Sequence, residues 1–402
     1  MTLLKFVSAG LLVGLSLSAA MAQIKVEMVA PAGAPDSNFQ LPDRAIYTVR
    51  PANPGDLATL DAQSAAGTTI PLWNANVTSF GTNYSFEMVG KSPLVKQTGQ
   101  TSKITSPVIP VIFKFETTAG VLLHTFSPIA ADPVCSPAGT GYSLALASPL
   151  LNDHAYTVGG KNIGNTQYVD FFQRANFYEY TKPGSTNPKY HVLLTQSNSS
   201  TNPLTVTVTV KGFPIDSEPC GEVGLIEYNQ WDSLLQGTIF PELAADGVTA
   251  KTFPIFEFYN VVMYNETESN CCILGYHGNF TNAGAFQTYA VSNFDTSGAF
   301  TGSFDISGMS HEIAEWMNDP TGTNPTPAWG HIGQVSGCQS NLEVGDPLSG
   351  TTVIVTMPNG YHYHPQELAF FSWFYRESPS IGLDGWYSSN DTFKTSAGPI
   401  CE

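Results

Sequence analysis

Charged side chains are scarce in this chain, and basic ones are the scarcest. Lys, Arg, Asp and Glu together make up 12% of the 402 residues, against roughly 25% in an average soluble protein. The 16 basic and 33 acidic side chains give a formal net charge of −17. Nucleic acids and anionic membrane surfaces bind proteins through Lys and Arg, so we expect neither as a partner.

Several catalytic signatures are also missing. The chain has no G-x-S-x-G sequence, which disfavours a serine hydrolase with a nucleophile elbow. It has no P-loop and no G-x-G-x-x-G after a predicted strand, so nothing indicates a nucleotide site. It has no Cys-x-x-Cys pair, which disfavours a cysteine zinc knuckle. A glycosidase with two carboxylates leaves no local signature and remains a third-ranked alternative.

Long apolar runs are absent after the first residues of the chain. Lys5 is followed by an apolar run from Phe6 to Ala20, which ends in Ala20-Met21-Ala22. This pattern is typical of a signal peptide, and we expect residues 1–22 to be removed by cleavage before Gln23. No later segment is apolar for 18 residues, so we expect no membrane span. The sequence thus predicts a secreted protein, extracellular or periplasmic.

The six cysteines all lie in the predicted mature chain, at positions 135, 220, 271, 272, 338 and 401. Secretion together with an even number of cysteines predicts at least two disulfides. Cys271 and Cys272 are neighbours in sequence, and we expect them to bond to two different partners, such as Cys338 and Cys401.

The first part of the mature chain, residues 23–215, is predicted to be β-rich. Residues 111–116 and 204–210 alternate between apolar and polar side chains, which is typical of strands. An aromatic stripe near 168–180 predicts one helix. A polar, proline-containing break suggests a domain boundary near residue 215.

The second part, residues 216–402, has a different pattern. Its predicted elements are a helix over 228–245 interrupted near Gly237 and Pro241, strands over 253–264 and 285–294, a tight turn at 275–278, a helix from Asp305 or Ser307 to Asn318, and a helix over 366–376. This order is the one expected in the upper lobe of a zincin. The predicted fold is therefore α+β, with a β-rich N-terminal part and a zincin-like α+β C-terminal part.

One motif indicates a specific chemistry, His311-Glu312-Ile313-Ala314-Glu315. Residues i and i+4 share one face of a helix, so His311 and Glu315 can bind the same metal ion. Glu312 would then act as general base toward a water on the metal. The usual motif is H-E-x-x-H, and carboxylate oxygen is an accepted zinc ligand in place of the second His. The alternative is a solvated acidic helix face with one incidental His.

A catalytic zinc site needs a third protein ligand. We favour Glu343 for this role over His331, with His277 in third place. The alternative for Glu343 is a surface turn, because Asp346 follows closely in the same segment.

Two further carboxylates have possible roles near the metal. Asp346 can orient His311 by a hydrogen bond, as carboxylates often do for metal-bound imidazoles. Asp319 continues the row of residues 311 and 315 along the helix, but an Asp before Pro more often forms a turn.

The chain resembles a known family in several short segments. These are Gly275-Tyr276-His277, the 311–315 motif with Asp319-Pro320, Ala328-Trp329, and Glu343-Val344-Gly345-Asp346. Together they resemble the Exordium (phosphate-induced) proteins of plants and related secreted bacterial proteins. The resemblance implies an extracellular protein linked to cell walls and growth, with a helix that is similar to that of a remote zincin.

The chain departs from the family pattern at three places. Trp316 replaces a small residue on the helix, the stretch between Trp329 and Glu343 is longer, and Pro347 stands where the family often has Cys.

We therefore expect a secreted zinc-dependent hydrolase, most simply a peptidase-like protein acting on peptides or a cell-wall polymer. The rival hypothesis is a non-catalytic extracellular or cell-wall-associated binding protein of the Exordium-like type. Its helix would hold a structural cation or none. The sequence leaves the oligomeric state open.

Overall fold

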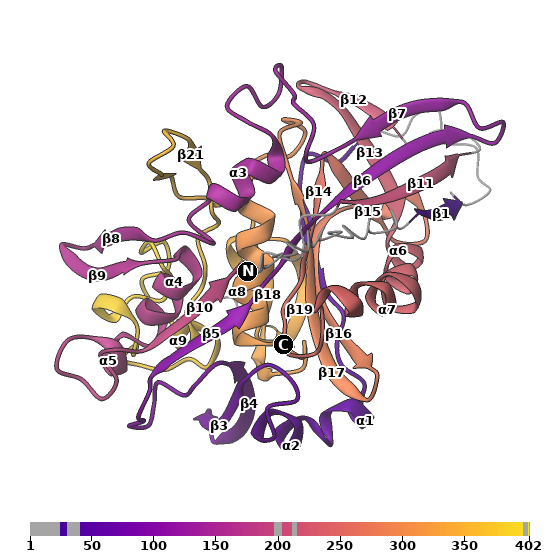
Figure 1. Ribbon diagram of the computed structural model, residues 1–402. Coiled ribbons are helices and arrows are strands. Elements are labelled where there is room, and N and C mark those ends of the chain that lie inside the picture. The colour runs from indigo at the N-terminus through magenta and orange to yellow at the C-terminus, as the bar shows by residue number, and fades with distance from the viewer. Residues whose placement is uncertain (1–24, 30–40, 197–202, 211–214, 397–400, 402) are drawn as a thin grey trace, which may run out of the picture.

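The computed structural model describes residues 25–29, 41–196, 203–210, 215–396 and 401. The predicted signal peptide, residues 1–22, lies outside these ranges. The molecule is a mixed α+β protein in which strands predominate, and its main sheet curls into a half-barrel (Figure 1). The predicted α+β class is confirmed at this level.

Eleven strands of the described chain form the main sheet. Along the sheet they are β1 (Lys25–Val29), β11 (Leu204–Val210), β6 (Val108–Thr117), β14 (Ile255–Tyr259), β17 (Ala285–Phe294), β16 (Cys271–Asn282), β15 (Val261–Tyr264), β13 (Gly221–Glu227) and β12 (Ile215–Glu218), with β7 (Leu122–Phe126) beside β6 and β2 (Ile46–Val49) beside β16. Strands β6 and β14 pair in parallel. The sheet therefore takes strands from both sides of residue 215.

One face of the sheet is covered by a helical segment that is broken where the sequence predicts. Helix α6 (Tyr228–Leu234) continues into a π-helical stretch, Leu235–Ile239, and then into α7 (Phe240–Leu243). Gly237 lies within the π-helical stretch, and Pro241, which has no N–H to donate, follows at the start of α7. This segment packs its apolar side chains onto strands β6, β11 and β14.

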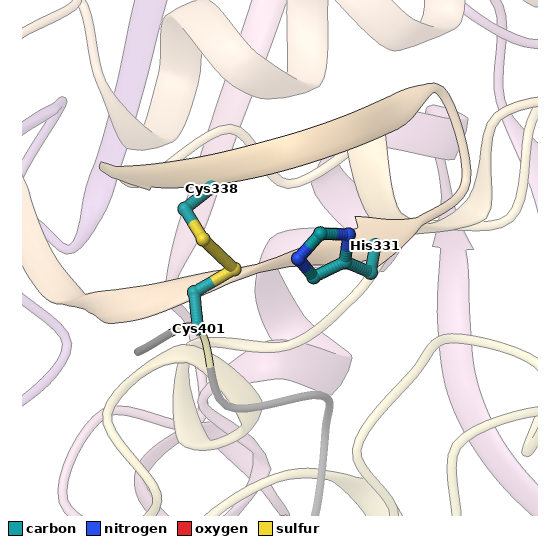
Figure 2. Close-up of side chains that lie close together, drawn as sticks. All are labelled: His331, Cys338 and Cys401. Carbon is teal, nitrogen blue, oxygen red and sulfur yellow. A yellow bond between two sulfur atoms is a disulfide. The ribbon is translucent and has the colours of Figure 1, made fainter.

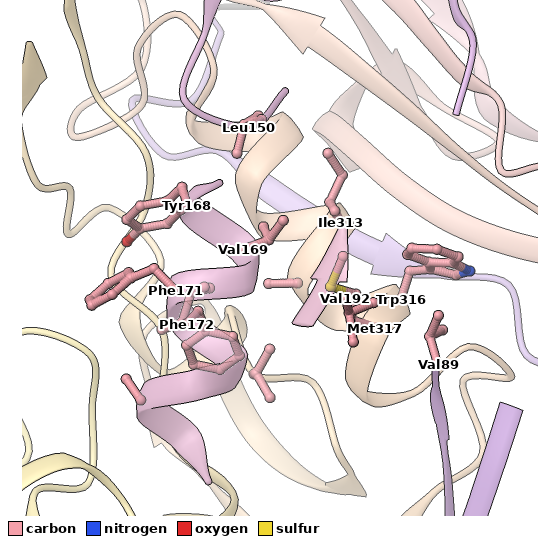
Figure 3. Close-up of a cluster of buried hydrophobic side chains, with 14 of the residues drawn as sticks. Val89, Leu150, Tyr168, Val169, Phe171, Phe172, Val192, Ile313, Trp316 and Met317 are labelled. Atoms are coloured by element: carbon pink, nitrogen blue, oxygen red, sulfur yellow. The ribbon is translucent and has the colours of Figure 1, made fainter. Parts of the chain in front are cut away.

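The opposite face is covered by helix α8 (Ser307–Asn318), and helix α4 (Tyr168–Asn176) packs against α8. Figure 3 shows side chains of both helices in one buried apolar cluster, among them Val169 of α4 and Ile313 and Met317 of α8. Trp316 stacks on Phe253, with ring centroids 3.5 Å apart. This large indole fills the space between the helix and the sheet, and its Nε1 donates to the Thr288 hydroxyl at 3.0 Å.

Smaller elements surround this two-sided arrangement. They are α1 (Pro54–Leu57), α2 (Leu60–Ala65), β3 (Leu72–Ser79), β4 (Thr82–Val89), β5 (Thr101–Thr105), α3 (Gly141–Ala147), β8 (His154–Val158), β9 (Lys161–Thr166), α5 (Tyr178–Thr181), β10 (His191–Thr195), β18 (Pro325–Ile332), β19 (Val335–Asn341), β20 (Val355–Thr356), β21 (His362–Tyr363) and α9 (Phe371–Phe374). Strands β18 and β19 form an antiparallel hairpin that follows α8 in the chain.

The predicted tight turn at 275–278 is wrong, because these residues lie inside strand β16. Their glycines serve close packing instead. A Cβ atom on Gly275 would lie 2.9 Å from Cγ of Glu312, and one on Gly278 would lie 2.8 Å from the hydroxyl of Tyr289. Glycine in a strand often marks such a close approach.

Two other predicted elements differ in extent. The strand predicted over 253–264 is two strands, β14 and β15, because Asn260 turns the chain with a φ of +51°. The helix predicted over 366–376 shrinks to α9. The N–H groups of Ala369 and Phe370 donate to the carbonyls of Val344 and Tyr387, both at 2.9 Å, so the residues before α9 pair with other segments.

Three disulfides are present, and the prediction of at least two is confirmed. They join Cys135 to Cys220, Cys271 to Cys272, and Cys338 to Cys401. The expectation that Cys271 and Cys272 bond to downstream cysteines is wrong. Cys338 on β19 is bonded to Cys401 near the end of the chain. Cys271 and Cys272 are bonded to each other. Within the described ranges, no helix is long and apolar enough to cross a membrane.

Candidate metal centre

The predicted motif lies on the buried face of α8, against strands β16 and β17. His311, Glu312 and Glu315 are each at most 1% exposed. Two glycines make room for these side chains. Gly275 admits Glu312, as described above, and a Cβ atom on Gly345 would lie 2.4 Å from Nδ1 of His311.

His311 has a defined orientation. Its Nδ1 lies 3.0 Å from Oε1 of Gln366, whose Nε2 donates to the carbonyl of Gly345 at 2.6 Å. Because the Gln366 oxygen faces the ring, Nδ1 is the nitrogen that carries the hydrogen in the neutral imidazole. Nε2 then presents its lone pair toward Oε1 of Glu315, 2.9 Å away, and Oδ1 of Asp346, 3.5 Å away.

His277, on strand β16, is oriented in the same manner. Its Nε2 lies 3.2 Å from the carbonyl oxygen of Asp319, which can only accept, so Nε2 carries the hydrogen. Nδ1 faces Oε2 of Glu312 at 3.1 Å and Oε2 of Glu315 at 3.8 Å. Burial lowers the pKa of His277 to about 3, so the imidazole is neutral at physiological pH.

The carboxylates around α8 are held by donors from distant segments. The backbone N–H of Gly345 donates to Oε1 of Glu315 at 3.0 Å. Asp346 accepts from the side-chain amides of Gln334 and Gln339. Such outer contacts orient metal ligands in known metalloproteins.

Glu343 and Glu312 complete the cluster. Asn341 donates to Oε1 of Glu343 at 3.0 Å, and the Glu343 carboxyl also forms a hydrogen bond with Glu315. Oε1 of Glu312 is buried and has no hydrogen-bond partner.

Burial makes this concentration of acids electrostatically costly. It raises the pKa values of Glu312, Glu315 and Glu343 well above their usual range, and neighbouring carboxylates raise them further. The pKa of Asp346 is raised by burial too. For His311, burial lowers the pKa, but Asp346 and Glu312 outweigh this and the net direction is upward.

The donor set fits a metal ion. One ligand atom each from His311, Glu315 and Asp346 lie within 4.8 Å of one another. Nε2 of His311 is also buried without an aligned hydrogen bond. Imidazole nitrogen and carboxylate oxygen are both zinc ligands, and a cation would offset the buried negative charge.

Only some of the predicted site residues lie together in the structure. Around His311 and Glu315 it places Asp346 as the third potential ligand, whereas Glu343 neighbours Glu315 and is not part of that group of ligand atoms. The carboxylate of Asp319 accepts from the backbone N–H groups of Thr323 and Asn324, both at 2.9 Å. Asp319 therefore closes the loop after α8, which is the turn role the sequence favoured.

His331 is far less suited to a metal. It is exposed on β18, beside Cys338 and Cys401 (Figure 2). The two sulfur atoms are bonded to each other and cannot act as thiolate ligands. This group of three is therefore a disulfide with a neighbouring imidazole.

Sequence reasoning missed four contributors. Gln366 orients His311, Gln334 and Gln339 hold Asp346, and the ring of Tyr47 stacks on His311 at a centroid distance of 4.0 Å. No local pattern marks these residues, because Gln366 and Tyr47 act on a partner far away in the chain and the two other glutamines act across a hairpin and a turn.

Comparison with known protein families, curated proteins and solved structures finds no match for this chain. The resemblance to Exordium-like proteins therefore stays an expectation.

Proposed function

We propose that the protein is a secreted metal-dependent hydrolase with a zincin-like C-terminal part, in which His311, Glu315 and Asp346 hold zinc. The observation that carries this proposal is the buried Nε2 of His311, which faces two carboxylate oxygens without an aligned hydrogen bond. A bound zinc ion would supply Lewis acidity, which polarises a scissile carbonyl.

The protein side chains supply positioning and proton transfer. Gln366 fixes the tautomer and ring plane of His311, and the Gly345 N–H fixes one oxygen of Glu315. Oε1 of Glu312 has no hydrogen-bond partner and can accept a proton. Burial raises the pKa of the Glu312 carboxyl, which favours proton uptake. This supports the predicted role of Glu312 as general base.

The substrate class follows from the same proposal. A secreted hydrolase with this ligand set would act on peptides or on a cell-wall polymer. The centre is closed, because Tyr47 covers His311 and every ligand is buried. Substrate entry therefore requires Tyr47 and strand β2 to move.

The closed centre also favours a second candidate function. A cation enclosed on all sides is typical of a structural site. In that case the protein is a non-catalytic extracellular or cell-wall-associated binding protein.

Activity measurements separate the two functions. Wild type, chelated wild type and Glu312→Gln are incubated with libraries of peptides and wall polymers. The hydrolase proposal expects cleavage by wild type, its loss on chelation, and a rate lowered by about 10²- to 10⁴-fold in Glu312→Gln. No cleavage by metal-loaded wild type supports the binding protein, and cleavage that survives both treatments places the chemistry elsewhere.

A further inference from the structure

Two histidines of the cluster are arranged alike, although only one belongs to the motif. His311 on α8 and His277 on β16 each have one ring nitrogen against an oxygen acceptor that fixes the tautomer. In each ring the other nitrogen faces two carboxylate oxygens. Glu315 serves both rings, with Oε1 toward His311 and Oε2 toward His277.

These contacts define two sets of ligand atoms that share one residue. The first is His311, Glu315 and Asp346, and the second is His277, Glu312 and Glu315. Within each set the ligand atoms lie within 4.8 Å of one another. A carboxylate that offers one oxygen to each of two neighbouring sites has the geometry of a bridging ligand.

Unsatisfied atoms occur in both sets. Nε2 of His311 and Oε1 of Glu312 are buried without a hydrogen-bond partner. Both residues are 0% exposed. A lone pair that faces carboxylate oxygens in a buried site is repelled unless a proton or a cation lies between them.

The acidic side chains are distributed over both sets. Four carboxyl groups lie together here, on Glu312, Glu315, Glu343 and Asp346, and all four are buried. Each set combines one imidazole with two of these carboxyl groups. A divalent cation bound to a set would offset the charge of the carboxylates that hold it, which lowers the cost of burying them.

We propose that the centre binds two divalent cations, bridged by Glu315, with the second ion held by His277 and Glu312. Only the first ion rests on the proposed function above. Two-metal centres with ions about 3.5–4 Å apart occur in several classes of hydrolase. Glu312 can bind an ion through Oε2 and still accept a proton at Oε1, so its proposed role in proton transfer is compatible.

The first test is the metal content of the full secreted chain, dialysed against zinc and measured by mass spectrometry. We expect two equivalents per chain. Loading with Mn²⁺ and recording the electron paramagnetic resonance spectrum gives a measurement that needs no variant. Two ions bridged by one carboxylate are expected to give an exchange-coupled spectrum in place of the six lines of an isolated Mn²⁺.

Variants then assign each ion. His277→Ala and His311→Ala should each retain about one equivalent, and Glu315→Gln should retain fewer than one. His331→Ala is the matched control and should retain two, because His331 is exposed and outside the cluster. Thermal melting identifies any variant that fails to fold.

The outcomes distinguish this inference from the proposed function. One equivalent in wild type, unchanged in His277→Ala and lost in His311→Ala, overturns the second site and leaves the first. A six-line Mn²⁺ spectrum at full loading likewise overturns it. No bound metal in wild type removes both proposals.

Discussion

At the scale of single residues, the centre depends on small side chains as much as on ligands. Gly345 lies against the ring of His311, where a Cβ atom would approach to 2.4 Å. The same residue donates its N–H to Glu315 and accepts from Gln366 through its carbonyl. Its backbone therefore touches three parts of the centre.

We predict that Gly345→Ala displaces His311 and weakens metal binding by at least tenfold. Overpacking of a buried site typically costs about 1–3 kcal/mol of stability, so the melting temperature of the variant should also fall. Metal titration and thermal melting measure both effects. Gly337→Ala is the control, because nothing lies within 4 Å of its added Cβ. Equal affinity in the two variants would contradict the proposed position of His311.

A second residue-scale prediction concerns Glu87, on strand β4. Burial raises its pKa to about 7, with help from Asp61 and Asp319, and its Oε1 has no hydrogen-bond partner. A carboxyl whose folded pKa lies above its usual 4.5 binds protons more readily when folded. Its contribution to stability therefore increases as pH falls from about 7 toward 4.5 and is lost as pH rises through that range.

Glu87→Gln should consequently be more stable than wild type at pH 8. Partial exposure to solvent limits the gain to about 1–2 kcal/mol. The difference should shrink steadily as pH falls toward 4.5, as followed by denaturant unfolding at several pH values. A difference that is independent of pH would mean that the Glu87 carboxyl does not titrate in this range.

The sequence predicted the residues of the centre that lie on one helix, and it missed those that come from other parts of the chain. His311, Glu312 and Glu315 follow from helical spacing, which the sequence displays directly. Asp346 was predicted only to orient His311, because no local rule places it beside Glu315. Gln366 was not predicted at all, since its role depends on how a segment after the β20–β21 hairpin folds back on α8.

At the scale of elements, helix α8 and strand β16 carry the two histidines, and strand β2, which pairs with β16, covers His311. Tyr47 of β2 stacks on His311, and its hydroxyl bonds with the Ser303 hydroxyl at 2.9 Å. Gln334 ties the backbone of Tyr47 to Asp346. Strand β2 is thus attached to the centre through both its ring and its backbone.

We predict that removing this cover exposes the metal. Tyr47→Ala should release metal to a chelator at least tenfold faster than wild type, because the ring over His311 is gone. Tyr47→Phe keeps the ring and loses only the bond to Ser303, so its release rate should stay close to that of wild type. Metal release is followed with a chromogenic chelator. Equal rates in all three proteins would show that ions leave by another route.

Element boundaries were predicted well where the pattern is strong. Strand β17 and the C-terminal end of helix α8 at Asn318 agree with the sequence-based ranges. The segment 275–278 was mistaken for a turn because two glycines usually indicate one. Here the glycines accommodate side chains from other elements, and the sequence alone does not show those neighbours.

At the scale of the whole molecule, one sheet spans the boundary that the sequence suggested near residue 215. Strand β6 from the first part pairs with β14 from the second, and β11 pairs with β6. Composition and pattern do change near that boundary, but strand pairing over long distances leaves no mark in the sequence. Disulfide pairing was similarly beyond reach, because six cysteines allow 15 pairings.

The three disulfides predict that the secreted, non-reduced protein has no free thiols after unfolding. Thiol titration in denaturant measures this directly. The fragments from proteolysis without reduction should show Cys135 joined to Cys220 and Cys338 joined to Cys401. Two or more free thiols would contradict the pairing of all six cysteines, and six free thiols would remove the support that disulfides give to an extracellular location.

The central claim is that α8 holds a metal ion through His311 and Glu315. The most direct measurement is the zinc content of purified wild type and of Glu315→Gln, determined side by side after removal of loosely bound metal. We predict stoichiometric zinc in wild type and a loss of most of it in the variant, with both proteins folded. Wild type without metal, or a variant that retains all of it, would contradict the account.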